Sequence, residues 1–125
     1  MTKSLEVLVV DDEPLVRNTL KKMLERSGHR VLEAEDGVQA LSIFEQHSPD
    51  LMICDIIMPN MEGIETLREV KKASPKVKVI VISGGARTGS LSYLSVAEKL
   101  GADAVMDKPF GAKKLVDTID AVFKK

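Results

Sequence analysis

Short apolar runs alternate with longer segments of helical periodicity along this chain. The runs are Leu5 to Val10, Arg30 to Ala34, Leu51 to Cys54, Val77 to Ile82 and Ala104 to Met106. The first, third and fourth are apolar at nearly every position instead of alternating, which is typical of parallel strands covered by helices on both faces. The pattern therefore predicts an α/β protein, a doubly wound sheet of five parallel strands with five helices.

The segments that follow the runs carry helix signals of their own. Pro14 suits the first turn of a helix and Gly28 suits its end, so the first helix is predicted between them. Asp36 followed by Gln39 predicts a capped start for the second helix. Apolar stripes place the other three at Gly63 to Ala73, Leu91 to Leu100 and Leu115 to Phe123.

Composition narrows the class of protein. With 125 residues, 44% hydrophobic and 30% charged, we expect one globular domain over residues 1–125 and no output domain in this chain. No apolar run approaches the roughly 20 residues of a membrane helix, and no signal peptide is evident, so we expect a cytoplasmic location. The net charge of −1 without a basic stripe predicts no direct nucleic-acid or membrane binding.

The lone cysteine and the two histidines are expected to play no chemical role. Cys54 lies inside an apolar run, which predicts a buried core thiol and no disulfide. His29 and His47 lie where exposed loops or helix ends are expected, so neither is assigned to a metal site or to a phosphorelay.

Polar residues terminate four of the five runs. Asp11-Asp12 follows the first run, Asp55 the third, Ser83 the fourth and Asp107-Lys108 the fifth. Ligands of open parallel sheets bind outside the carboxyl ends of the strands, where these groups should meet. Taken alone, Asp11 and Asp12 could equally be a solvated strand end and a helix N-cap.

Clustered carboxylates suit a hard cation, and Mg²⁺ in particular binds through one or two carboxylates together with phosphate oxygens. A carboxylate such as Asp55, beside Mg²⁺ and the ammonium of Lys108, can act as the nucleophile of phosphoryl transfer. Lys108 could also simply form a salt bridge with Asp55. The hydroxyl of Ser83 and the amide of Gly84 are candidates to hydrogen-bond phosphoryl oxygens.

Four motifs on the expected strands resemble the receiver domains of bacterial two-component response regulators: VLVVDDEP, DIIMPNMEG, VISGG and DKPF, in the family's order and over essentially the whole chain. The resemblance implies a flavodoxin-like strand order 2-1-3-4-5. It also implies a role for individual positions: Asp55 as phosphoacceptor, Asp11 and Asp12 with the backbone carbonyl of Ile57 as Mg²⁺ ligands, Ser83 as switch residue and Lys108 as phosphate-binding lysine.

The same resemblance implies the partners. The donor would be a phosphohistidine on a sensor histidine kinase or a phosphotransfer protein, and an unidentified protein effector would recognise the face of the fourth helix, fifth strand and fifth helix. The chain would act as a signalling switch and not as an enzyme with a separate substrate, either as a monomer or as a dimer formed on phosphorylation.

Two positions depart from the family pattern. Val105 stands where receivers commonly carry the aromatic half of the switch, and the loop from Gly84 to Ser90 is longer than in compact chemotaxis-type members. A dehalogenase-type phosphatase would want an aspartate at the position of Ile57, and a flavodoxin would want a polar phosphate loop in place of Asp11 to Pro14. A receiver-like module that binds partners without phosphorylation is the nearer alternative.

Overall fold

The computed structural model describes residues 4–55, 63–83, 99, 101–107 and 110–124. It contains one parallel sheet of five strands in the order β2-β1-β3-β4-β5. The strands are β1 (Glu6–Val10), β2 (Arg30–Ala34), β3 (Leu51–Asp55), β4 (Lys78–Ser83) and β5 (Ala104–Asp107). The predicted doubly wound sheet and its strand order are confirmed.

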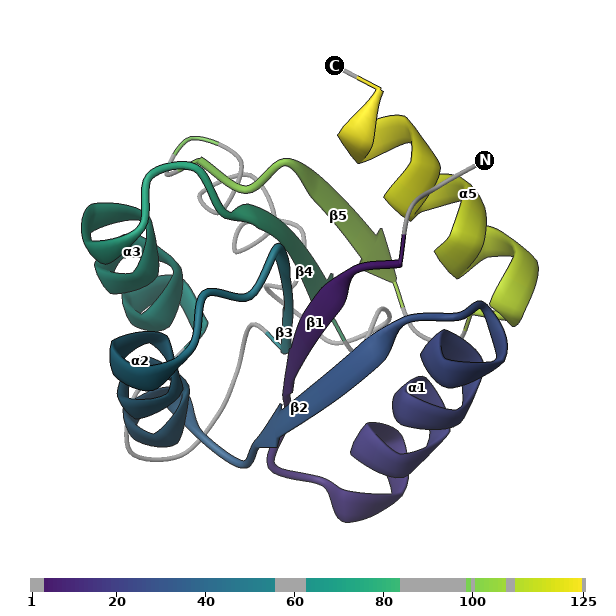
Figure 1. The fold of residues 1–125 in the computed structure, drawn as a ribbon, viewed down its shortest axis with the longest axis horizontal. Helices are drawn as coiled ribbons and strands as arrows, with labels where there is room; N and C mark the ends of the chain where they lie inside the picture. The colour runs from purple at the N-terminus through teal and green to yellow at the C-terminus, as the bar shows by residue number, and fades with distance from the viewer. Residues whose placement is uncertain (1–3, 56–62, 84–98, 100, 108–109, 125) are drawn as a thin grey trace.

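Four helices cover the sheet within the described residues: α1 (Pro14–Arg26), α2 (Gly37–Gln46), α3 (Gly63–Ala73) and α5 (Ala112–Phe123). In Figure 1, α1 and α5 lie on one face of the sheet and α2 and α3 on the other. The predicted fourth helix, Leu91 to Leu100, lies outside the described residues apart from Lys99. No helix among the described residues is long and apolar enough to cross a membrane.

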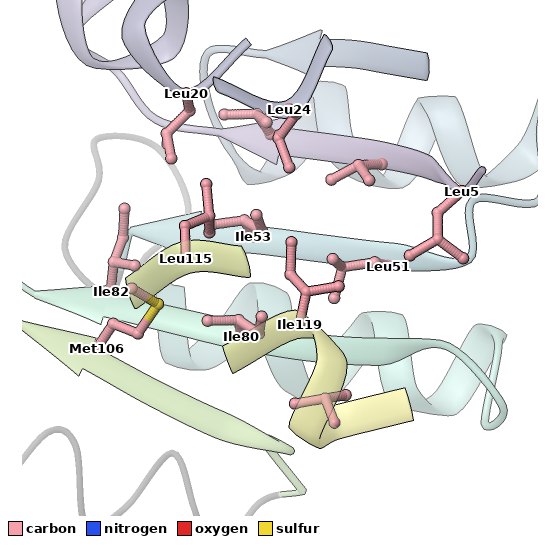
Figure 2. Close-up of a cluster of buried hydrophobic side chains, with 13 residues drawn as sticks. Leu5, Leu20, Leu24, Leu51, Ile53, Ile80, Ile82, Met106, Leu115 and Ile119 are labelled. Atoms are coloured by element: carbon pink, nitrogen blue, oxygen red, sulfur yellow. The ribbon is translucent and has the colours of Figure 1, made fainter. Parts of the chain in front are cut away.

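The core is divided in two by the sheet, because successive residues of a strand point to opposite faces. Val7 and Val9 of β1 join the cluster under α1 and α5, whereas Leu8 and Val10 join the cluster under α2 and α3. Figure 2 shows the first cluster, in which Leu20 of α1 and Leu115 of α5 face the central strands. The four residues of β3 from Leu51 to Cys54 are buried, as the unbroken apolar run predicted, and Asp55 at the end of the strand is buried with them.

The helix boundaries follow the predicted signals. Pro14 begins α1, and Gly28 adopts φ 91° after its end, a left-handed conformation that glycine tolerates without strain. Asp36 caps α2 by accepting a hydrogen bond from the backbone N–H of Gln39 at 2.9 Å. The Gln39 side chain in turn accepts from the N–H of Glu35 at 3.0 Å, so both partners satisfy otherwise unbonded donors.

The expectation that His29 is exposed is wrong, whereas His47 is exposed as predicted. Only 8% of His29 is exposed, and its Nδ1 accepts a hydrogen bond from the backbone N–H of Leu5 at 3.1 Å. Residue 29 directly precedes β2, so pairing of β2 with β1 brings the imidazole beside Leu5, which directly precedes β1. His29 lies at the amino ends of the strands, opposite the carboxyl ends that carry the aspartates, and no role in metal binding is assigned to it.

Candidate functional site

The carboxyl ends of β1 and β3 lie side by side in the sheet. Val10 of β1 is in register with Cys54 of β3, so the next residues, Asp11 and Asp55, leave the two strands at the same level. Asp12 follows directly. Each of the three aspartates offers a carboxylate oxygen to a group whose members all lie within 4.8 Å of one another.

The three carboxylates differ in their access to solvent. Asp11 is fully buried and Asp55 is 7% exposed, whereas Asp12 is exposed. A group with two sheltered carboxylates and one open to water can take up an ion from solvent and hold it against carboxylates that have little hydration of their own. Close like charges repel, and a cation between them removes that penalty.

Local hydrogen bonds fix Asp11 in place. Its backbone N–H donates to the carbonyl of Ala34 on β2 at 3.1 Å, and its Oδ1 accepts from the N–H of Glu13 at 2.9 Å. The N-cap of α1 is Glu13, without a side-chain capping bond, so Asp11 is not the helix cap that the sequence left open. It instead closes a tight turn between β1 and α1 through the bond from the N–H of Glu13.

Cys54 is a buried free thiol directly before Asp55. Burial raises its pKa well above the ordinary value, and the charges of Asp55 and Asp11 raise it further. The thiol therefore stays protonated and donates to the backbone carbonyl of Asp55, with Sγ 3.2 Å from the oxygen. A protonated thiol is a poor metal ligand, which leaves oxygen as the donor type at this site.

This donor set fits a hard divalent cation. Carboxylate oxygens suit Mg²⁺, Ca²⁺ or Mn²⁺ far better than metals that prefer sulfur or imidazole. Mg²⁺ needs only one or two carboxylates because it retains several waters, and an edge that is open at Asp12 leaves room for them. The three carboxylates could therefore hold Mg²⁺ and still leave coordination positions for a ligand.

The remaining predicted site residues are placed in part. Ser83 ends β4 and is in register with Asp107 at the end of β5, although the side chains of both lie outside what the structure describes. Ile57, Gly84 and Lys108 also lie outside the described residues. The same holds for the longer loop from residue 84 to 90.

Val105 lies on β5 in register with Val81 of β4 and is half-buried. It packs against the core cluster under α2 and α3. An aliphatic side chain in this place contributes to the core, and it cannot provide the ring rotation that an aromatic residue would.

Two charged residues near the site were not singled out from the sequence. Nη1 of Arg17 donates to the backbone carbonyl of Asp11 at 2.8 Å, and its Nε lies 3.4 Å from Oε1 of Glu33 on β2. A possible signal is the position of Arg17 one turn into the helix that follows the acidic pair. Its partners are a backbone carbonyl and a residue of another strand, so only the folded register brings them together.

A doubly wound parallel sheet of this kind defines a class of α/β proteins whose ligands bind at the carboxyl ends of the strands, and this chain places its three clustered carboxylates there. The chain belongs to the response regulator receiver domain family, whose family model matches residues 7–120. It is a CheY-like receiver domain of two-component signalling, as its motifs predicted.

Three relatives illustrate the match. The chemotaxis protein CheY of Bacillus subtilis (strain 168) is 36% identical over 115 residues, which are 91% of this chain and 93% of CheY. A response regulator receiver domain protein from Clostridium thermocellum has a solved structure with 35% identity and a TM-score of 0.87, covering 95% of this chain and 94% of that one. NtrX from Brucella abortus, solved in complex with ADP, gives 30% identity and a TM-score of 0.90, covering 98% of this chain but 27% of NtrX.

Proposed function

We propose that this receiver takes a phosphoryl group onto Asp55 in the presence of Mg²⁺ and changes a protein-binding face in response. The observation that carries the proposal is the group of carboxylates of Asp11, Asp12 and Asp55 within 4.8 Å of one another at one edge of the sheet. Membership of the receiver family supports the same chemistry. The donor would be a phosphohistidine on a sensor histidine kinase or a phosphotransfer protein.

Asp55 is the best placed of the three aspartates to be the acceptor. It ends β3, the central strand, between β1 and β4, so the groups at the ends of both neighbours can reach a phosphoryl group bound to it. Asp11 is fully buried and uses Oδ1 for the turn at Glu13, and Asp12 lies beyond the strand end in solvent. These two are better suited to hold the metal.

The transfer is a displacement at phosphorus. A carboxylate oxygen of Asp55 attacks, a P–O bond forms, and the P–N bond to the donor imidazole breaks with its electron pair staying on nitrogen. Mg²⁺ would neutralise charge on the phosphoryl oxygens, held by Asp11, Asp12 and Asp55 together with the carbonyl of Ile57. Lys108, Ser83 and the amide of Gly84 would bind the remaining phosphoryl oxygens.

The response would be conformational. A phosphoryl group adds about −1.5 to −2 charges and three acceptor oxygens, which can draw Ser83 and Lys108 toward Asp55. With Val105 in place of an aromatic residue, the switch would depend on these two polar groups. We infer a protein effector, without direct nucleic-acid or membrane binding, and a monomer or a dimer that forms on phosphorylation.

The domain would act in the cytoplasm, as one receiver unit over residues 1–125. A free thiol at Cys54 is compatible with a reducing compartment. The proposed role is that of a signalling switch, which catalyses only its own phosphorylation and dephosphorylation.

Intact mass after incubation with acetyl phosphate, with Mg²⁺ or with EDTA, tests the proposal. We expect a Mg²⁺-dependent gain of one phosphoryl group in the wild type and none in Asp55→Asn. Asp50→Asn is the matched control, because Asp50 precedes the opposite end of the same strand and its Oδ2 accepts from the N–H of Glu6 at 2.9 Å, a bond that asparagine can keep. Absence of any gain in the wild type would instead favour an interaction module that works without phosphorylation.

A further inference from the structure

Arg17 connects three elements beside the acidic site. It projects from the beginning of α1, and its Nη1 donates to the carbonyl of Asp11 at 2.8 Å. Its Nε lies 3.4 Å from Oε1 of Glu33 on β2, and only 16% of the side chain is exposed. The guanidinium therefore lies against the turn that carries the two aspartates, with Glu33 on its other side.

The hydrogen bond from Arg17 is one of three that hold Asp11 in place. The N–H of Asp11 is bound by Ala34, its carboxylate by the N–H of Glu13, and its carbonyl by Arg17. The first bond ties the turn to β2, the second closes the turn itself, and the third ties it to α1. Of these three, only the third depends on a side chain outside the turn.

The orientation of the Arg17 guanidinium favours its hydrogen bond to the carbonyl of Asp11 over its ion pair with Glu33. Nε is buried and, among the described residues, has no hydrogen-bond partner, although Glu33 is close. A buried donor without a partner is costly, and such exceptions in a folded protein call for an explanation. Here the guanidinium keeps its bond to Asp11 instead of rotating to pair fully with Glu33.

We propose that Arg17, supported by Glu33, is a positioning residue for the metal site: it fixes the β1–α1 turn so that Asp11 and Asp12 present their carboxylates toward Asp55. For phosphoryl transfer the role rests on the function proposed above. For cation binding it rests on the contacts of Arg17 and on the cation site proposed above at Asp11, Asp12 and Asp55. Lys21 also pairs with Glu33, at 3.7 Å, but among the described residues it makes no hydrogen bond to the turn, and so it does not share the role.

Positioning and simple charge make opposite predictions for loss of the arginine. If Arg17 acted only through its positive charge, removing it would make the surroundings of the three carboxylates more negative, and a divalent cation would bind more tightly. If Arg17 positions the turn, removing it frees Asp11 and Asp12 to separate under their mutual repulsion, and the cation binds more weakly. The direction of the change in affinity therefore distinguishes the two roles.

The test is a titration with Mn²⁺, followed by water-proton relaxation, on the full chain. We expect Arg17→Gln to weaken Mn²⁺ binding at least fivefold and Arg17→Lys, which keeps the charge and a donor, to recover part of the loss. Lys21→Gln is the matched control on the same helix and should stay within twofold of the wild type. In acetyl phosphate reactions, Arg17→Gln should raise the half-saturating Mg²⁺ concentration by a similar factor, with the rate at saturating Mg²⁺ much less affected.

Unchanged or tighter Mn²⁺ binding by Arg17→Gln, or an equal loss in Lys21→Gln, would overturn the inference. Should Arg17→Gln fail to fold, Glu33→Gln must weaken binding more than Glu35→Gln, which removes an equivalent exposed charge two residues along. If the wild type binds Mn²⁺ and Arg17→Gln binds it weakly, but acetyl phosphate never modifies the protein, only the proposed phosphorylation fails. If modification occurs and Arg17→Gln keeps wild-type affinity, only the positioning role fails.

Discussion

Aspartate is used differently at the two edges of the sheet. At the amino edge, Oδ2 of Asp103 accepts from the N–H of Val79 at 2.9 Å and from Nζ of Lys71 at 3.1 Å. At the carboxyl edge, three aspartates turn carboxylates toward one another within 4.8 Å. The first arrangement pairs opposite charges and joins elements of the fold, whereas the second concentrates like charge where a ligand can bind.

The comparison separates stability from function within one small domain. Lys71 of α3 also donates to the carbonyl of Val77 at 2.7 Å, so the Asp103 cluster links α3, β4 and the approach to β5. Such contacts stabilise the fold in the absence of any ligand. Carboxylates this close repel one another, and a cation bound between them would relieve that repulsion.

The largest effect is expected at the amino edge. Asp103→Ala removes acceptors of Val79 and Lys71 and should lower the free energy of unfolding by about 2 to 3 kcal/mol, below the full cost of breaking a buried pair because Lys71 can reach water. Asp103→Asn keeps an acceptor for Val79 and should lose about half as much. Urea unfolding measures both, and a loss in Asp103→Ala of under about 0.5 kcal/mol would refute a stabilising role for this cluster.

A bound cation should offset the repulsion among the carboxylates at the carboxyl edge and so stabilise the fold. Mg²⁺ at ten times its dissociation constant should raise the free energy of unfolding by about 1.4 kcal/mol, because it binds the folded chain alone. Chelation by EDTA should remove this gain, and Asp12→Asn should reduce it by losing a ligand. The measurement is urea unfolding with Mg²⁺ against EDTA. Identical midpoints at millimolar Mg²⁺ in the wild type would contradict a metal site at this edge.

Much of the arrangement at the carboxyl edge of the sheet could be predicted from the sequence. The unbroken apolar run of β3 indicates a buried parallel strand, and parallel strands bring their carboxyl ends to one edge, so the approach of Asp55 to Asp11 follows from the fold class alone. Local signals also sufficed for the capped start of α2 at Asp36, because a cap involves only residues close in sequence.

Contacts that depend on the folded register could not be predicted in the same way. Arg17 occupies a helix position that reads as solvated, and its role appears only when β2 brings Glu33 beside it. His29 follows a helix stop, where exposure is the usual outcome, but it is buried and its Nδ1 accepts from the N–H of Leu5. The roles of Ser83, Gly84, Ile57 and Lys108 remain predictions, as does the fourth helix.

A smaller effect of opposite sign is expected from Asp12→Asn without metal. Removing one of three close charges relieves repulsion and should raise the free energy of unfolding in EDTA by up to about 1 kcal/mol, limited by the exposure of Asp12 to solvent. Asp50→Asn, at the amino edge, should leave stability nearly unchanged. If Asp12→Asn were instead destabilising in EDTA, the carboxyl edge would not be strained by like charge, and the contrast between the edges would lose its basis.

The smallest effect concerns His29 at the amino edge. Burial lowers the pKa of its imidazole from the ordinary value of 6.5, although the charge of Asp120 partly opposes this. At pH values between the lowered pKa of folded His29 and 6.5, the unfolded chain binds a proton that the folded chain does not. The free energy of unfolding is therefore unaffected by this group above pH 6.5 and falls as the pH drops through this window. Protonation would also remove Nδ1 as the acceptor for Leu5.

His29→Asn isolates this contribution. The asparagine oxygen can accept from the N–H of Leu5 at a position close to that of Nδ1, yet the side chain does not titrate. The difference in unfolding free energy between wild type and His29→Asn should therefore be constant above pH 6.5 and shift against the wild type below it. A constant difference from about pH 7.5 down to 5 would show that His29 titrates alike in both states, and that its burial gives the amino edge no sensitivity to pH.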